Sequence, residues 1–175
     1  MTKAVYITDI AAFLPNDPVA NDEMEGILGA INGRRSRARS LVLRNNGIKT
    51  RYYAIDKHSG ELRYTNARLT VEAIRRLKLD PAHIEVLSCG TSSPDQLMPG
   101  HGVMVHGELG ATPCEVNSSA GICTAGMVAL KYAWLSVLSG HSSNAVATGS
   151  EVASTFMQAK NFEPESEARV TEMEQ

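Results

Sequence analysis

Short apolar segments alternate with helical patterns along most of the chain, and this order constrains the fold more than any other feature. Three apolar segments have the length and endings of strands: 84–89, 114–116 and 144–149. Helices are predicted around and between them: 65–77, 99–109 and from 123 to about 139. Because strands joined by helical crossovers pair in parallel, the order predicts an α/β fold with a mostly parallel sheet covered by helices on both faces.

The first 55 residues are expected to add further elements. The apolar run 4–13 is predicted to be a buried strand that ends at the turn residues 14–18. The other predicted elements are a helix from Asn21 or Asp22 to about 31, a short basic helix over 34–44 and a strand over 50–55. The arginines of the basic helix are interpreted as a solvated helix face.

Length and composition predict one domain over residues 1–161. A chain of 175 residues that is 43% hydrophobic can bury a real core. From residue 162 the apolar content falls and five glutamates crowd the sequence. Residues 162–175 are therefore expected to be an acidic, exposed tail or linker at which the chain is truncated.

Charge and cysteine content exclude several classes of protein. A formal net charge of −2 and a pI near 6.2 provide no basic surface for a nucleic acid. No segment approaches the ~20 apolar residues of a membrane span, and the N-terminus has no signal-peptide pattern. Three cysteines without a CxxC pair fit a reducing compartment. We expect a cytoplasmic protein that binds small molecules or other proteins, with no nucleic-acid or membrane partner.

The candidate catalytic residue is Cys123, which follows a short strand and a run of small residues and opens an apolar helix. Backbone amides and the helix dipole at such a position favour the nucleophilic thiolate. The helix itself is expected to be buried on nearly all sides, with one stripe of large residues: Met127, Leu130, Trp134 and Leu138. From these residues alone, a free cysteine that packs as a small hydrophobic residue remains an alternative, and this is the expectation for Cys89 and Cys114.

Several segments, in this order, resemble ketoacyl synthase III and its relatives: Arg44-Asn45-Asn46-Gly47-Ile48, Glu85 to Ser93, Leu97-Met98-Pro99, Gly121-Ile122-Cys123-Thr124-Ala125-Gly126 and Ala147-Thr148-Gly149-Ser150-Glu151. The resemblance covers about 150 residues. It implies the thiolase-like fold, of which this chain is the N-terminal half of a duplicated unit with a buried central helix. The Cys-Thr-Ala-Gly-Met surround is closer to chalcone-synthase-like members, which leaves the subfamily open.

The same resemblance implies a decarboxylative Claisen condensation. Cys123 would accept an acyl group from coenzyme A or an acyl carrier protein, and a malonyl thioester would then lose CO₂ and attack it. Coenzyme A enters only as a substrate, so no cofactor is expected, and the enzyme is expected to be a homodimer. The family's catalytic His and Asn belong to the other half of the fold, so this chain alone is expected to be inactive.

The resemblance also places three substrate-binding candidates. Arg44 corresponds to an arginine that contacts the adenine end of coenzyme A, although a structural arginine at a helix end is the alternative. Met98 corresponds to an apolar residue inserted across the dimer interface into the acyl pocket, with core packing as the alternative. Met127, one turn beyond Cys123, is the third.

Histidines and glycines argue against other functions. The five histidines are expected in loops or on the surface, and His101 and His106 are spaced too awkwardly for a metal site. The turn after the first apolar run has no glycine to approach a pyrophosphate, so a dinucleotide-binding module is not supported. A non-catalytic thiolase-fold partner subunit remains the alternative to an enzyme.

Overall fold

The computed structural model describes residues 4–34 and 38–162. The chain divides into two compact units, a sheet unit (Met1–Leu14 and Thr65–Glu151) and a second unit (Pro15–Tyr64 and Val152–Gln175). The sequence had predicted a single domain over 1–161. The predicted acidic tail lies almost wholly outside the described residues, so its boundary stays a prediction.

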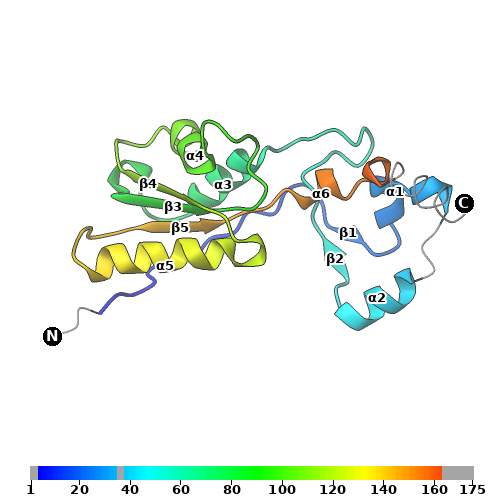
Figure 1. The fold of residues 1–175 in the computed structure, drawn as a ribbon, viewed down its shortest axis with the longest axis horizontal. Helices are drawn as coiled ribbons and strands as arrows, with labels where there is room; N and C mark the ends of the chain where they lie inside the picture. The colour runs from blue at the N-terminus through cyan, green and yellow to red at the C-terminus, as the bar shows by residue number, and fades with distance from the viewer. Residues whose placement is uncertain (1–3, 35–37, 163–175) are drawn as a thin grey trace, which may run out of the picture. The chain divides into compact units, whose positions relative to one another are not determined.

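The sheet unit is built on three parallel strands, β3 (Val86–Gly90), β4 (Glu115–Ser119) and β5 (Val146–Gly149) (Figure 1). β3 lies in the centre and pairs with β4 on one side and β5 on the other, in the order β4-β3-β5. Every residue of β3 is buried, as expected for the central strand of a covered sheet. The predicted parallel sheet is confirmed.

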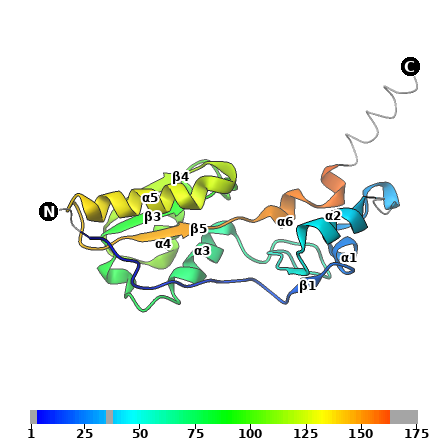
Figure 2. The same ribbon diagram turned by 90° about the horizontal axis from the view of Figure 1, so that it is seen from below.

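Helices cover both faces of this sheet, also as predicted. α3 (Asn66–Ile74) and α4 (His101–Leu109) lie on one face, and α5 (Ala125–Leu138) lies on the other (Figures 1 and 2). α3 begins where expected, because the Thr65 hydroxyl oxygen accepts the N–H of Arg68 at 3.1 Å. Among the described residues, every helix is too short or too polar to cross a bilayer.

The main core lies between β3, β5 and the pair α3 and α4. Its buried members are Ala67, Val71, Ile74, Ile84, Leu87, Cys89, Val105, Leu109 and Val146. Cys89 is fully buried there and Cys114 packs against the cluster, so the expectation that both cysteines serve packing is confirmed.

α5 contacts the sheet through its small residues rather than its large ones. Its buried positions are Ala125, Ala129, Ala133 and Ser136, which share one face of the helix. The predicted stripe faces outward instead, with Met127 65% and Trp134 45% exposed. The expectation of a helix buried on nearly all sides is therefore wrong for the described part of this chain, because small side chains let α5 approach the sheet and nothing described here covers its other face.

The predicted strand over 4–13 is not formed. These residues run without regular pairing, and Tyr6, Ile7 and Ile10 are 78%, 68% and 81% exposed. Polar contacts hold the segment instead. Asp9 accepts the N–H of Lys78 at 2.8 Å, and Arg76 donates to the carbonyl of Ala12 at 2.7 Å. A strand needs a neighbour to pair with, and the described residues provide none here.

The second unit contains short elements. β1 (Val19–Ala20) pairs antiparallel with β2 (Thr50–Arg51). Two short helices lie between these strands in the sequence, α1 (Met24–Leu28) and α2 (Arg39–Asn46), and α6 (Ala153–Phe156) comes near the end of the chain. The helix predicted from Asn21 or Asp22 to 31 is thus shorter, and the strand predicted over 50–55 ends early. The basic helix begins at Arg39, with residues 35–37 outside the described part.

The second unit contains a small apolar cluster and a cavity. Val19, Tyr53 and Ile55 form a buried cluster against Ile27 and Leu28. A separate cavity of about 530 Å³ is lined mainly by apolar residues of α1 and α2 together with Met157, Ala159 and Phe162.

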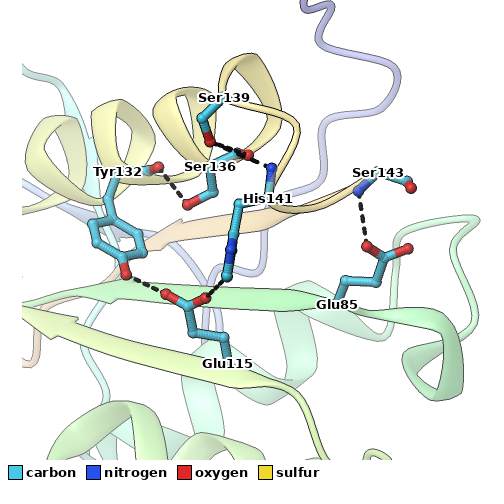
Figure 3. Close-up of polar contacts among 7 residues, drawn as sticks. All are labelled: Glu85, Glu115, Tyr132, Ser136, Ser139, His141 and Ser143. Atoms are coloured by element: carbon cyan, nitrogen blue, oxygen red, sulfur yellow. Dashed lines mark hydrogen bonds and ion pairs between the residues drawn. The ribbon is translucent and has the colours of Figure 1, made fainter.

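At the start of β4, a polar cluster attaches the end of α5 to the sheet (Figure 3). The Glu115 carboxylate accepts from the Tyr132 hydroxyl and lies 2.6 Å from Nε2 of His141. Glu85, before β3, accepts the N–H of Ser143 at 2.8 Å. The hydrogen bonds from Tyr132 and His141 hold the pKa of Glu115 below its usual value, and the bond to Glu115 raises the pKa of Tyr132.

This cluster predicts a pH dependence of stability. Because the folded-state pKa of Glu115 is lowered, its contribution is present above the unfolded-state pKa and is lost as the pH falls through the folded-state value. We expect Glu115→Gln in the full-length protein to lower the free energy of unfolding at neutral pH by less than about 1 kcal/mol, since water screens this exposed group. Urea titrations of the variant and of wild type at pH 7 and near pH 3 measure this difference in the free energy of unfolding. The difference from wild type should shrink at low pH, whereas Glu108→Gln should show no such change; a constant difference would contradict the assignment.

Candidate active site

Cys123 lies in a tight turn between β4 and α5, at the carboxyl edge of the sheet. The turn is a short 3₁₀ helix, Ile122–Thr124, and α5 begins at the next residue. Within it, the N–H and hydroxyl of Thr124 both donate to the carbonyl of Gly121, at 2.9 and 2.6 Å. The turn exposes Cys123 to solvent.

The residue before the cysteine has a strained backbone. Ile122 adopts φ = 50°, in the left-handed region that a β-branched side chain rarely occupies. Such a conformation costs on the order of 1–3 kcal/mol and is typical of residues that serve a function rather than stability. Ile122 is also 74% exposed, so burial of its side chain does not offset this strain.

Close contacts at three glycines fix the start of α5 on the sheet. A Cβ at Gly90, the last residue of β3, would lie 2.2 Å from the carbonyl oxygen of Ala125. Gly126 and Gly149 face each other, and a Cβ on either would lie 3.1–3.2 Å from the other's Cα. The N-terminus of α5 therefore sits directly on the ends of β3 and β5, and this contact places the turn that carries Cys123.

The three cysteines differ in their surroundings. Burial raises the pKa of Cys89 to about 11 and also raises that of Cys114, so both thiols stay protonated at neutral pH. Cys123 is exposed beside the N-terminus of a 14-residue helix, whose partial positive charge favours an anion. The predicted ionisation of Cys123 itself stays a prediction. Because Cys123 is exposed, it can be reached from solvent, which is a condition for nucleophilic attack on a substrate carbonyl.

The substrate-binding candidates fall in different places. Met127 lies one turn into α5, on the exposed face. Met98 lies in the loop after β3 and is 86% exposed, so the alternative of core packing is not supported within the described residues. Met98 and Met127 belong to the segments that follow β3 and β4 at the carboxyl edge of the sheet, where Cys123 also lies. Arg44 lies in the last turn of α2, in the second unit, where it is exposed.

Behind this edge lies a buried polar network that the sequence did not reveal. The hydroxyl oxygens of Thr70 and Ser150 are 2.7 Å apart, and Nε2 of His101 lies 3.3 Å from the first and 3.4 Å from the second. The side-chain amide of Asn66 donates to the Thr91 hydroxyl and to the Ser93 carbonyl, both at 2.7 Å. A signal for it was present, since 91–95 and 150–151 directly follow two parallel strands, whose carboxyl ends share one edge.

His101 corrects one expectation about the histidines. It was expected in a loop or on the surface, but it is the first residue of α4 and only 2% exposed. Burial lowers its pKa, while the carboxylates of Asp95 and Glu151 act in the opposite direction. Among the described residues no three His, Cys, Asp or Glu side chains gather as metal ligands would.

The sequence of this chain is similar to those of known enzymes. No protein-family model matches the chain. Among curated proteins it is 30% identical to the beta-ketoacyl-(acyl-carrier-protein) synthase III of Bordetella petrii over 161 residues, which are 90% of this chain and 46% of that protein. It is 26% identical to the enzyme of the same name from Campylobacter fetus, over 89% of this chain and 44% of the relative.

Solved structures agree on the fold. The chain superposes on AbyA1, a tetronic acid condensing enzyme, with a TM-score of 0.66 and 28% identity, covering 83% of this chain and 45% of that one. It superposes on the fungal type III polyketide synthase ORAS with a TM-score of 0.69 and 22% identity, covering 91% and 50%. The Thermus thermophilus beta-ketoacyl synthase III gives a TM-score of 0.67 at 21% identity, covering 85% and 43%.

The parallel sheet, the strand-turn-helix junction and these superpositions define the class: the chain has the thiolase-like fold of condensing enzymes, and that expectation is confirmed. Its sequence is similar to curated beta-ketoacyl-(acyl-carrier-protein) synthase III enzymes, as its sequence motifs indicated. It spans about half the length of the curated relatives it matches.

Proposed function

We propose that the full-length protein is an acyltransferase that condenses an acyl thioester with a malonyl thioester through an acyl group held on Cys123. The observation that carries this proposal is the exposed sulfur in a strained turn between a parallel strand and a helix N-terminus. The similarity to condensing enzymes supports the reaction class.

The reaction has two steps. In the first, the Cys123 thiolate attacks the carbonyl carbon of the acyl thioester, and the thiol of coenzyme A or of a carrier protein leaves. In the second, the malonyl thioester loses CO₂, and the resulting enolate carbon forms a bond to the acyl carbonyl while the Cys123 sulfur leaves. The product is a 3-oxoacyl thioester, and the enzyme returns to its starting state with no redox change.

Three further residues have proposed roles in substrate binding. Met98 and Met127 are exposed apolar side chains at the carboxyl edge and suit an acyl chain. The guanidinium of Arg44 is permanently charged and suits the phosphorylated nucleotide end of coenzyme A. Acyl-CoA, a malonyl thioester and an acyl carrier protein are the proposed partners, and the enzyme is proposed to be a homodimer.

A second thiolase-like half is proposed to complete the site and to supply the His and Asn that stabilise the enolate and the oxyanion. The outward face of α5 supports this, because contiguous exposed apolar side chains mark a contact surface. That face carries Met127, Val128, Leu130, Trp134 and Leu135. Residues 1–175 alone should accordingly show no condensation.

A condensation assay with the full-length protein tests the proposal. Acyl-CoA substrates from acetyl to dodecanoyl are mixed with malonyl-CoA or malonyl carrier protein, and 3-oxoacyl products are followed by mass spectrometry together with CO₂ release. Product from at least one acyl chain is expected. Absence of product with every donor would favour the alternative, a non-catalytic thiolase-fold partner of a sister enzyme.

A further inference from the structure

The loop between β3 and α4 (residues 91–100) has an apolar tip that its own packing does not hold. Leu97 and Met98 at the tip are 89% and 86% exposed. The polar contact at the tip is local: the side-chain amide of Gln96 donates to the carbonyl of Met98 at 3.0 Å. Whatever fixes the position of Met98 must therefore act at the base of the loop.

Glu151 holds one side of that base. Its carboxylate accepts the N–H of Ser92 through Oε1 at 2.7 Å and the hydroxyl of Ser93 through Oε2. Hydrogen bonds to an ionised carboxylate are roughly twice as strong as neutral ones. Glu151 itself is placed by the strand before it, because the N–H of Ser150 donates to the carbonyl of Gly90 at 3.2 Å.

Asp95 holds the other side. Its two oxygens accept the N–H groups of Asn66 and Ala67, at 2.7 and 2.8 Å, at the N-terminus of α3. The positive end of the α3 dipole adds to this interaction. Since the buried side chain of Asn66 also donates to the Ser93 carbonyl, the loop is attached through the backbone of 92 and 93 and the side chain of 95 to α3 and to the segment after β5.

These contacts lie at the edge where α5 begins. The N–H of Thr91, the first loop residue, donates to the carbonyl of Ser119 at the end of β4 at 3.0 Å. Gly149, two residues before Glu151, lies against Gly126 of α5. The loop base and the turn of Cys123 therefore share the carboxyl ends of the same three strands.

We infer that Glu151 and Asp95 are positioning residues: they fix the loop that carries Met98 and thereby set which acyl-chain lengths Cys123 accepts. This inference rests on the proposed function. Neither carboxylate needs to touch the substrate. Without them the loop keeps the contact from the Asn66 side chain to the Ser93 carbonyl but loses its attachments at residues 92 and 95. Met98 then no longer has one position and discriminates poorly between chain lengths.

The first test measures the loop directly. In the full-length protein, amide hydrogen exchange of residues 91–98 is compared for wild type, Glu151→Ala, Asp95→Ala and the control Glu108→Ala, whose side chain makes no hydrogen bond or ion pair among the described residues. We expect exchange to become at least tenfold faster in the first two variants and to stay unchanged in the control. Unchanged exchange in both Glu151→Ala and Asp95→Ala would overturn the inference.

The second test measures selectivity. Initial rates of Cys123 acylation by acetyl-CoA and octanoyl-CoA are determined by mass spectrometry, and their ratio is compared. We expect the ratio to change at least fivefold in Glu151→Ala and Asp95→Ala, less in Glu151→Gln, whose amide oxygen still accepts the N–H of Ser92, and not in Glu108→Ala. Should the alanine variants fail to fold, Ser93→Ala removes the hydroxyl that contacts Glu151 and Asn66 and leaves both carboxylates in place, and its ratio should shift in the same direction.

The outcomes separate this inference from the proposed function. Acylation of wild type with the same ratio in every folded variant overturns the inference alone. Absence of any acyl group on Cys123 in wild type overturns the proposed function and this inference with it.

Discussion

Replacing Cys123 with alanine is expected to abolish the acyl adduct and to reduce condensation by at least about a thousandfold, the effect typical of removing a catalytic nucleophile. The physical reason is the position of the sulfur, exposed in the Ile122–Thr124 turn where α5 begins. Intact-mass measurement of the full-length protein after incubation with acyl-CoA tests this. Wild type should gain one acyl group and Cys123→Ala none.

Cys89 provides the matched control. Its thiol is fully buried and its pKa is raised to about 11, so Cys89→Ala should leave the adduct on Cys123 intact even if it lowers stability through the lost core packing. Iodoacetamide should modify Cys123 in the native protein and reach Cys89 only after unfolding. An adduct that survives Cys123→Ala, or one that is lost in a folded Cys89→Ala variant, would refute the assignment.

Much of the sheet unit could be predicted from local patterns. The segment before Gly90 is mostly apolar, as is typical of a central parallel strand, and β3 is buried throughout. A helix was predicted to begin at residue 65, and Thr65 does cap it by accepting the N–H of Arg68. Cys123 was placed at a strand-to-helix junction, because small residues precede it and an apolar helix follows it.

What escaped prediction depends on contacts between segments distant in sequence. The helix α5 was expected to be buried on nearly all sides, but the close approach at Gly90 and Gly126 buries only its face of small residues against the sheet. His101 was taken for a surface residue because its burial depends on Thr70 and Ser150, 31 and 49 positions away. The periodicity of apolar residues shows which side chains share one face of a helix, but it does not show which face another element covers.

Gly90→Ala is expected to have the largest effect on the fold. The new Cβ would lie 2.2 Å from the carbonyl oxygen of Ala125, 2.5 Å from its carbonyl carbon and 2.8 Å from the backbone nitrogen of Gly126. These are backbone atoms, so no rotamer change can relieve the overlap and α5 must move away from β3. We expect the free energy of unfolding to fall by about 3 kcal/mol, the upper part of the usual range for overpacking. Denaturant titration of the full-length protein measures this.

The same displacement should affect the chemistry, since Cys123 lies two residues before Ala125. A shift of about 1 Å in a reacting group can cost on the order of a hundredfold in rate, so acylation of Cys123 should fall by about that factor even in the folded fraction. Gly107→Ala is the matched control: Gly107 is exposed inside α4 with nothing within 4 Å of its added Cβ, and alanine there should be neutral or stabilising by about 0.5–1 kcal/mol. If Gly90→Ala were as stable and as active as Gly107→Ala, the close contact between β3 and α5 could not be what positions Cys123.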